Sequence, residues 1–179
     1  MLKKILIALG AIVVVFAGVV AMQPSEFRVV RTATISAPAP DVFAQVNDFH
    51  NWQAWSPWAK RDPAAKNSFE GPSRGTGAIF RWAGNKEVGE GSMTITESRP
   101  SDLIRIHLEF VKPFAGTSNV EFTFKSEGDR TAVTWSMVGQ NGFIGKALCL
   151  FMNMDKMIGG DYERGLAQMK SVVEAAIKK

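Results

Sequence analysis

Two histidines and one glutamate are the side chains in this sequence best suited to acid–base chemistry. His50 lies in a short segment rich in tryptophan, and Glu97 has the same strand parity as Met93 and Ile95. The imidazole of His50 or the carboxyl of Glu97 is able to exchange a proton with a bound molecule if it faces a cavity. A structural or solvent-exposed position is the competing interpretation for both. His107 lies on the polar side of an alternating strand, and we expect it at the surface.

Other reactive arrangements lack the spacing that their chemistry requires. Gly89–Met93 has no glycine two residues after its serine, so it is not a nucleophile elbow. Gly75–Gly77 has no third glycine for a dinucleotide-binding loop. Cys149 is the only cysteine, which excludes an internal disulfide, and we expect it to be a small buried apolar group. The sequence has no metal-ligand spacing, and we predict neither a metal nor a cofactor.

The length and composition allow one folded domain with an appendage. The chain has 179 residues, of which 46% are hydrophobic and 21% charged. These values are typical of a folded protein and too apolar for a disordered chain. A net charge of +4, without clustering, does not indicate nucleic-acid binding.

The first 24 residues predict a membrane anchor or a signal segment, with a separate domain over residues 25–179. Residues 5–22 carry no charge, and as a helix they span about 27 Å, close to the hydrocarbon core of a bilayer. We favour a single-pass anchor in the inner membrane. Lys3 and Lys4 place the N-terminus in the cytoplasm and the domain outside it, in the periplasm. Cleavage after Val19-Val20-Ala21 is the alternative.

Residues 25–179 predict an α+β domain with an antiparallel sheet. Alternating apolar residues leave one face of this sheet to be buried. Short helices are expected after Pro40 and Asp48, and a polar loop over residues 60–77. We expect strands over residues 27–36, 78–83, 87–97, 103–110, 119–125 and 131–138.

The last forty residues change to helical periodicity and contain no proline after Phe143. We predict one long amphipathic helix over residues 143–179, bent at Gly159-Gly160, with Asp161 as a fresh N-cap. This helix is the only predicted element long enough to cover the apolar face of the sheet. A curved sheet therefore grips the C-terminal helix.

The inner face of this arrangement carries unusually large side chains. Most of them are expected to form an ordinary core. One helix does not fill the open end of a curved sheet, so we also predict an apolar pocket there. The candidate ligand-binding residues are Trp55, Trp58, Phe80, Trp82, Met93, Ile95, Ile106, Leu108, Phe110, Phe122, Phe124, Trp135, Met137, Phe151, Met154 and Met157.

The order of these elements resembles the helix-grip fold of the SRPBCC superfamily, which includes START-type lipid carriers. The most similar subgroup is the bacterial polyketide cyclase/dehydrase-like proteins, and the resemblance covers about residues 25–179. It rests on the sequences at residues 35–38, 49–52, 55–58 and 154–161. The resemblance implies a hydrophobic cavity between the sheet and the helix, and it does not imply catalysis.

Three functions are consistent with these features. The first, which we favour, is binding or carriage of a hydrophobic, lipid-like or polyketide-like small molecule by a domain tethered to the membrane. The second is a polyketide cyclase/dehydratase-type enzyme that uses His50 or Glu97. The third is an envelope accessory protein with a filled interior and no ligand. The sequence predicts no oligomeric state.

Overall fold

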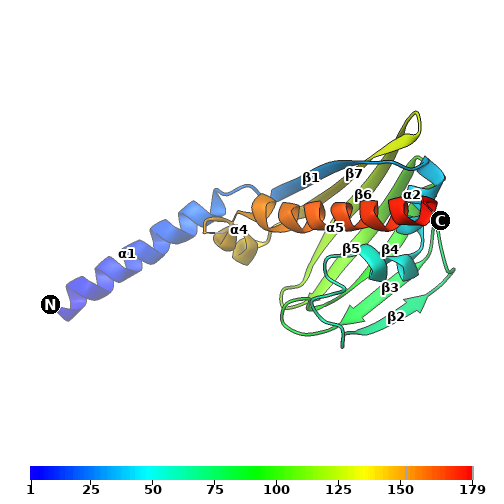
Figure 1. Cartoon of the computed structure of the whole chain (residues 1–179). Coiled ribbons are helices and arrows are strands. Elements are labelled where there is room, and N and C mark those ends of the chain that lie inside the picture. The colour runs from blue at the N-terminus through cyan, green and yellow to red at the C-terminus, as the bar shows by residue number, and fades with distance from the viewer. Residues whose placement is uncertain (152, 179) are drawn as a thin grey trace.

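The structure is a computed structural model, and it describes residues 1–151 and 153–178 (Figure 1). The side chains of Leu148 and Met154 lie outside the described part. A seven-stranded antiparallel sheet has the strand order β1-β7-β6-β5-β4-β3-β2. Its strands are β1 (Glu26–Ile35), β2 (Lys66–Glu70), β3 (Ile79–Ala83), β4 (Glu90–Arg99), β5 (Leu103–Lys112), β6 (Gly116–Glu127) and β7 (Arg130–Gln140).

The C-terminal helix α5 (Met154–Ile177) lies along the sheet, as Figure 1 shows. It buries Tyr162, Leu166, Met169 and Val173, which recur at helical spacing on one face. These residues join a continuous core with the inward residues of β4 to β7. The prediction of an α+β helix-grip fold is therefore confirmed.

Short helices cover part of the inner face between the sheet and α5. They are α2 (Ala39–Asn47), the 3₁₀ turn η1 (Phe49–Asn51) and α3 (Trp52–Trp55). Asp48 caps η1, because its Oδ1 accepts a hydrogen bond of 2.9 Å from the backbone N–H of His50. The indole N–H of Trp52 donates to the carbonyl of Val46 at 3.1 Å, which fixes α3 against α2.

Three sequence predictions are wrong in their local detail. The predicted polar loop contains β2, an edge strand whose five residues are all exposed, so it carries no alternating burial signal. The predicted single C-terminal helix is two helices, α4 (Phe143–Cys149) and α5. Asn153, whose side chain accepts from the backbone N–H of Lys156, is the N-cap of α5. The helix continues through Gly159-Gly160, and Asp161 forms ion pairs instead of a cap.

The N-terminal helix α1 (Leu2–Ala21) extends away from the domain (Figure 1). Among the described helices it is the one that is long and apolar enough to cross a membrane. Its side chains are largely exposed, but Val20 at its C-terminal end is fully buried. Its last turn therefore packs against the folded domain.

Candidate ligand-binding cavity

A cavity of about 940 Å³ lies between the inner face of the sheet, α5 and the segment that follows α3. Its volume is near the upper end of the range for small-molecule sites, about 300–1,000 Å³. Alternate residues of neighbouring strands form its walls, because side chains of one parity share a face of the sheet. The apolar wall residues include Phe80, Trp82, Met93, Leu108, Val120, Trp135 and Met137.

The sequence-predicted ligand-binding residues fall into three groups in the structure. The residues that line the cavity are Trp58, Phe80, Trp82, Met93, Leu108, Phe110, Trp135, Met137 and Met157. The residues that are instead packed in the core are Trp55, Ile95, Ile106, Phe122 and Phe124. Phe151 is 79% exposed, and the side chain of Met154 lies outside the described part of the chain.

The packed residues lie where the short helices fill the interior, which is why they do not line the cavity. Phe124 contacts Phe43 of α2 at a ring-centroid distance of 5.4 Å. Trp55 contacts Trp52 at 4.7 Å, and its indole N–H donates to the carbonyl of Gln45. The hollow is therefore confined to the other part of the inner face. Phe151 lies outside it because the chain turns there between α4 and α5.

Trp135 forms the boundary between the packed core and the cavity. Its ring stacks on Tyr162 at a centroid distance of 3.7 Å and on Phe122 at 4.8 Å. Trp58 meets it edge-on at 5.9 Å. The side chain is 1% exposed, and its indole N–H has no described acceptor at full hydrogen-bond geometry. It still acts on the Tyr162 hydroxyl, whose pKa it lowers against the larger effect of burial. A buried donor of this kind favours an oxygen or nitrogen acceptor beside it.

The stacked partner, Tyr162, is 2% exposed and lines the same cavity. Burial raises the pKa of its hydroxyl well above the ordinary value of 10.0. The phenol is therefore neutral at physiological pH and does not act as a general base.

The charged residues in the cavity lining include Arg61, Asp62, Glu87 and Asp161, and of these four Asp161 is the buried one. Asp161 on α5 is 6% exposed and accepts hydrogen bonds from Arg61 and Arg164. Arg61 follows α3 in the chain, so this ion pair joins that segment to α5 across the cavity. The carboxylate is compensated by two guanidinium groups, as a buried charge requires.

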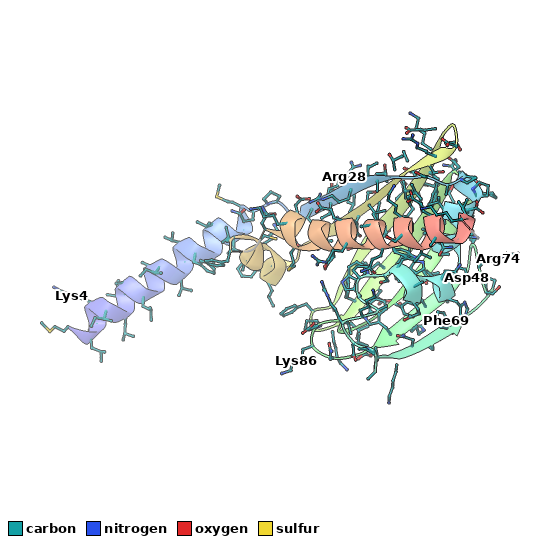
Figure 2. All side chains as sticks on the ribbon, in the orientation of Figure 1. Lys4, Arg28, Asp48, Phe69, Arg74 and Lys86 are labelled. Atoms are coloured by element: carbon teal, nitrogen blue, oxygen red, sulfur yellow. The ribbon has the colours of Figure 1, made fainter. Side chains whose placement is uncertain are left out.

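The two acid–base candidates from the sequence do not line the cavity. The ring of His50 stacks on Phe69 at 3.9 Å, and its Nδ1 lies 2.7 Å from Asp48 Oδ1. Figure 2 shows Asp48 and Phe69 far from α1, toward the end of the sheet where Arg74 lies. No histidine is found in the lining within the described part of the chain.

Glu97 is turned to the outer face of the sheet by a β-bulge. Ile95 pairs with Ile106, but Glu97 pairs with Arg105, so the register shifts at Thr96. One extra residue reverses the face of every side chain after it. Glu97 Oε2 accepts a hydrogen bond of 2.6 Å from Arg105. The residue therefore has the solvent-exposed position that the sequence offers as the competing interpretation, and not the inward position that strand parity alone indicates.

Several lining residues are missed by strand parity because they lie on other elements. Phe114 lies between β5 and β6, Phe143 and Ile144 begin α4, and Tyr162 is on α5. The signal of Phe114 in the sequence is an apolar residue in a connection, where polar residues are usual, whereas Phe143, Ile144 and Tyr162 belong to the apolar pattern of the predicted C-terminal helix. Phe27 at the start of β1 is also part of the lining.

A family model described as polyketide cyclase/dehydrase and lipid transport matches residues 26–174, which include the whole sheet and nearly all of α5. The chain belongs to this family. The matched part begins after α1, so the family match does not cover the apolar helix. No curated protein sequence matches the chain.

Solved structures with the same fold have low sequence identity to this family member. The aromatase/cyclase Zhui from Streptomyces sp. R1128 is 14% identical, with a TM-score of 0.63 over 85% of this chain and 96% of that chain. Protein MLL2253 from Mesorhizobium loti is 15% identical, with a TM-score of 0.60 over 83% and 98%. An uncharacterised protein from Rhizobium leguminosarum is 14% identical, with a TM-score of 0.60 over 84% and 95%. These similarities extend to the fold alone.

Proposed function

We propose that this protein binds an amphiphilic small molecule, lipid-like or polyketide-like, in the cavity, and that α1 tethers the domain to a membrane. The observation that carries the proposal is a cavity of about 940 Å³ walled by aromatic and methionine side chains. Such walls bind flat or flexible apolar groups without a fixed shape. Burial of about 300 Å² of apolar ligand surface contributes roughly 7 kcal/mol before the cost of ordering the ligand.

The polar groups in the cavity wall indicate which polar group the ligand has in addition to its apolar body. The indole N–H of Trp135 is buried without a described acceptor and borders the cavity. A ligand oxygen beside it removes the desolvation cost of that donor. The neutral Tyr162 hydroxyl adds a second polar group close by. We therefore propose an apolar body with at least one hydrogen-bond acceptor, such as a carboxyl, ester or carbonyl oxygen.

Binding without turnover is favoured over cyclase or dehydratase chemistry. A general base must reach the proton that it removes. His50 and Glu97 lie outside the lining. Of the carboxylates in the lining, Asp161 is held by two arginines, Asp62 accepts hydrogen bonds from the backbone N–H groups of Ala64 and Asn85, and Glu87 is exposed to solvent. Of the two activities in the family description, lipid transport fits these side chains better than cyclase or dehydrase chemistry.

The test uses the full chain in detergent micelles, stearic acid as the probe and native mass spectrometry as the readout. Leu108→Trp fills the cavity, whereas His107→Trp places the same bulk one residue away on the exposed outer face of β5. We expect one stearate bound to the original protein and to His107→Trp, and at least tenfold weaker binding to Leu108→Trp. Equal binding by both variants would exclude the cavity as the site.

A further inference from the structure

The mouth of the cavity lies at the end of the sheet to which α1 is attached. Strand pairing brings one end of each strand together here, through the registers of β1 with β7, β7 with β6, β6 with β5, β5 with β4 and β4 with β3. The residues at this end include Glu26, Gln140, Gly116, Lys112 and Ala83. The cavity is lined by residues next to these strand ends. In Figure 2, Lys86 of the β3–β4 connection marks this end, and Arg74 lies at the opposite end.

Large apolar side chains are exposed around this mouth. We define the rim as Phe110, Phe114, Phe143, Ile144 and Met157, all of which line the cavity and are between 37% and 59% exposed. They come from β5, the β5–β6 connection, α4 and the start of α5. A soluble domain rarely exposes a group of such residues together unless the surface meets an apolar partner.

The rim is fixed beside the C-terminal end of α1, not merely joined to it by a loose linker. Residues 22–25 alone separate α1 from β1. The Nζ of Lys146 in α4 lies 3.4 Å from the carbonyl oxygen of Ala21, and the backbone N–H of Asn141 donates to the carbonyl of Ser25 at 2.6 Å. Figure 1 shows α4 next to the end of α1. If α1 crosses a bilayer, α4 therefore lies at the bilayer surface.

We infer that the rim docks into the membrane leaflet that holds the C-terminal end of α1. The mouth of the cavity then opens onto the lipid acyl chains, and the ligand enters directly from the bilayer without passing through water. This inference rests on the proposed function. Lipid is the occupant that the structure favours, because the rim is continuous with an apolar helix of 20 residues. Lys146 flanks the rim, where a cationic side chain meets lipid phosphates, whereas Lys112 is paired with Glu90 at 2.6 Å.

The experiment measures contact between the rim and lipid in the full chain. Cys149, the single native cysteine, is replaced by serine. A fluorescent NBD label is then placed on Phe114→Cys or Phe143→Cys, and on Asp129→Cys in the β6–β7 hairpin as the control at the far end. The protein is reconstituted into phosphatidylcholine vesicles, with and without a lipid that carries a doxyl quencher at carbon 5.

We expect the quencher to reduce emission from positions 114 and 143 at least threefold more than emission from position 129. Equal quenching at all three positions overturns the inference. Self-quenching at position 114 that grows with protein density, without quenching by lipid, means that a second copy covers the rim and also overturns it. Stearate binding in micelles is independent of docking, so loss of lipid contact with retained stearate binding contradicts only this inference. Lipid contact at positions 114 and 143 without stearate binding contradicts only the proposed ligand site.

Discussion

The guanidinium group of Arg31 on β1 lies directly against the backbone of Gly159 in α5, in the space where any side chain would be placed. Arg31 donates to Asp155 at 2.9 and 3.0 Å and to Glu163 at 2.6 Å. Asp155, Gly159 and Glu163 are spaced four residues apart, so they share one helix face. The arginine therefore spans two turns of α5, and it crosses the helix at Gly159, where no side chain is in its way. The same hydrogen bonds lower the pKa of the Asp155 carboxyl.

Gly159→Ala is expected to lower the free energy of unfolding by about 1–3 kcal/mol, because the added methyl group displaces Arg31 from its acidic partners. The measurement is a urea titration of the full chain in micelles, followed by tryptophan fluorescence.

Gly160→Ala is the matched control for this substitution. A Cβ at this position meets only Arg164 Nη1, at an ordinary contact distance of 3.7 Å. Alanine is a better helix former than glycine, so we expect no change or a gain of up to about 1 kcal/mol. Similar losses for both alanine variants would show that the Arg31 contact does not control stability.

The glycine pair also shows what the sequence predicts well and what it does not. Strand alternation and helical periodicity identify the fold, because burial imposes those periods on long segments. A glycine that bends a helix and a glycine that admits a distant arginine look the same along the chain. Thr96 is a similar case, since nothing local indicates the bulge that turns Glu97 outward. Phe114 and Phe143 join the cavity only through tertiary structure.

Glu174 is expected to make stability depend on pH in a defined acid range. Hydrogen bonds from Lys170 and from the backbone N–H of Ser36 lower the pKa of Glu174 to about 2. Since the ordinary value is 4.5, the carboxylate stabilises the fold fully above pH 4.5. This contribution is lost as the pH falls from 4.5 toward 2.

Glu174→Gln is therefore expected to flatten the pH dependence of the unfolding free energy between pH 4.5 and 2. Glu127→Gln removes the same charge at the exposed end of β6 and is expected to leave the slope unchanged. Urea titrations at half-unit pH intervals provide the measurement. An unchanged slope in Glu174→Gln would contradict this assignment.

Replacement of either of two buried tryptophans by phenylalanine is expected to change the free energy of unfolding by different amounts. Trp55 is fully buried and donates its indole N–H to the carbonyl of Gln45 at 3.1 Å. Trp135 is equally buried, but no described residue accepts from it. Trp55→Phe deletes a hydrogen bond, whereas Trp135→Phe deletes an unpaired donor.

We expect the free energy of unfolding to fall by about 1 kcal/mol more in Trp55→Phe than in Trp135→Phe, because both lose similar ring area. The comparison uses stearate-free protein in the same urea titration. With stearate present, only the original protein and Trp55→Phe should gain the full ligand stabilisation. An equal gain in Trp135→Phe would show that this indole donates no hydrogen bond to the ligand.

Removal of the acidic partner of the ion pair in the cavity wall is expected to lower the free energy of unfolding more than removal of one basic partner. Asp161 is a single buried carboxylate that serves two partly exposed guanidinium groups, Arg61 and Arg164. Asp161→Asn leaves both arginines uncompensated beside an apolar cavity, and we expect a loss of about 2 kcal/mol in unfolding free energy. Arg61→Met leaves the carboxylate paired with Arg164, and its expected loss is below about 1 kcal/mol.

The same two variants separate a structural role from a role in closing the cavity. Arg61→Met removes the ion pair between the segment after α3 and α5 but leaves the contact of Trp58 with Tyr162, so stearate should dissociate faster in a stopped-flow exchange assay even though the fold is retained. Arg164→Met removes the partner on the same helix as Asp161 and leaves that link in place, so its release rate should match that of the original protein. Faster release in both variants would mean that the charge of the arginines, rather than the link from Arg61 to α5, retains the ligand.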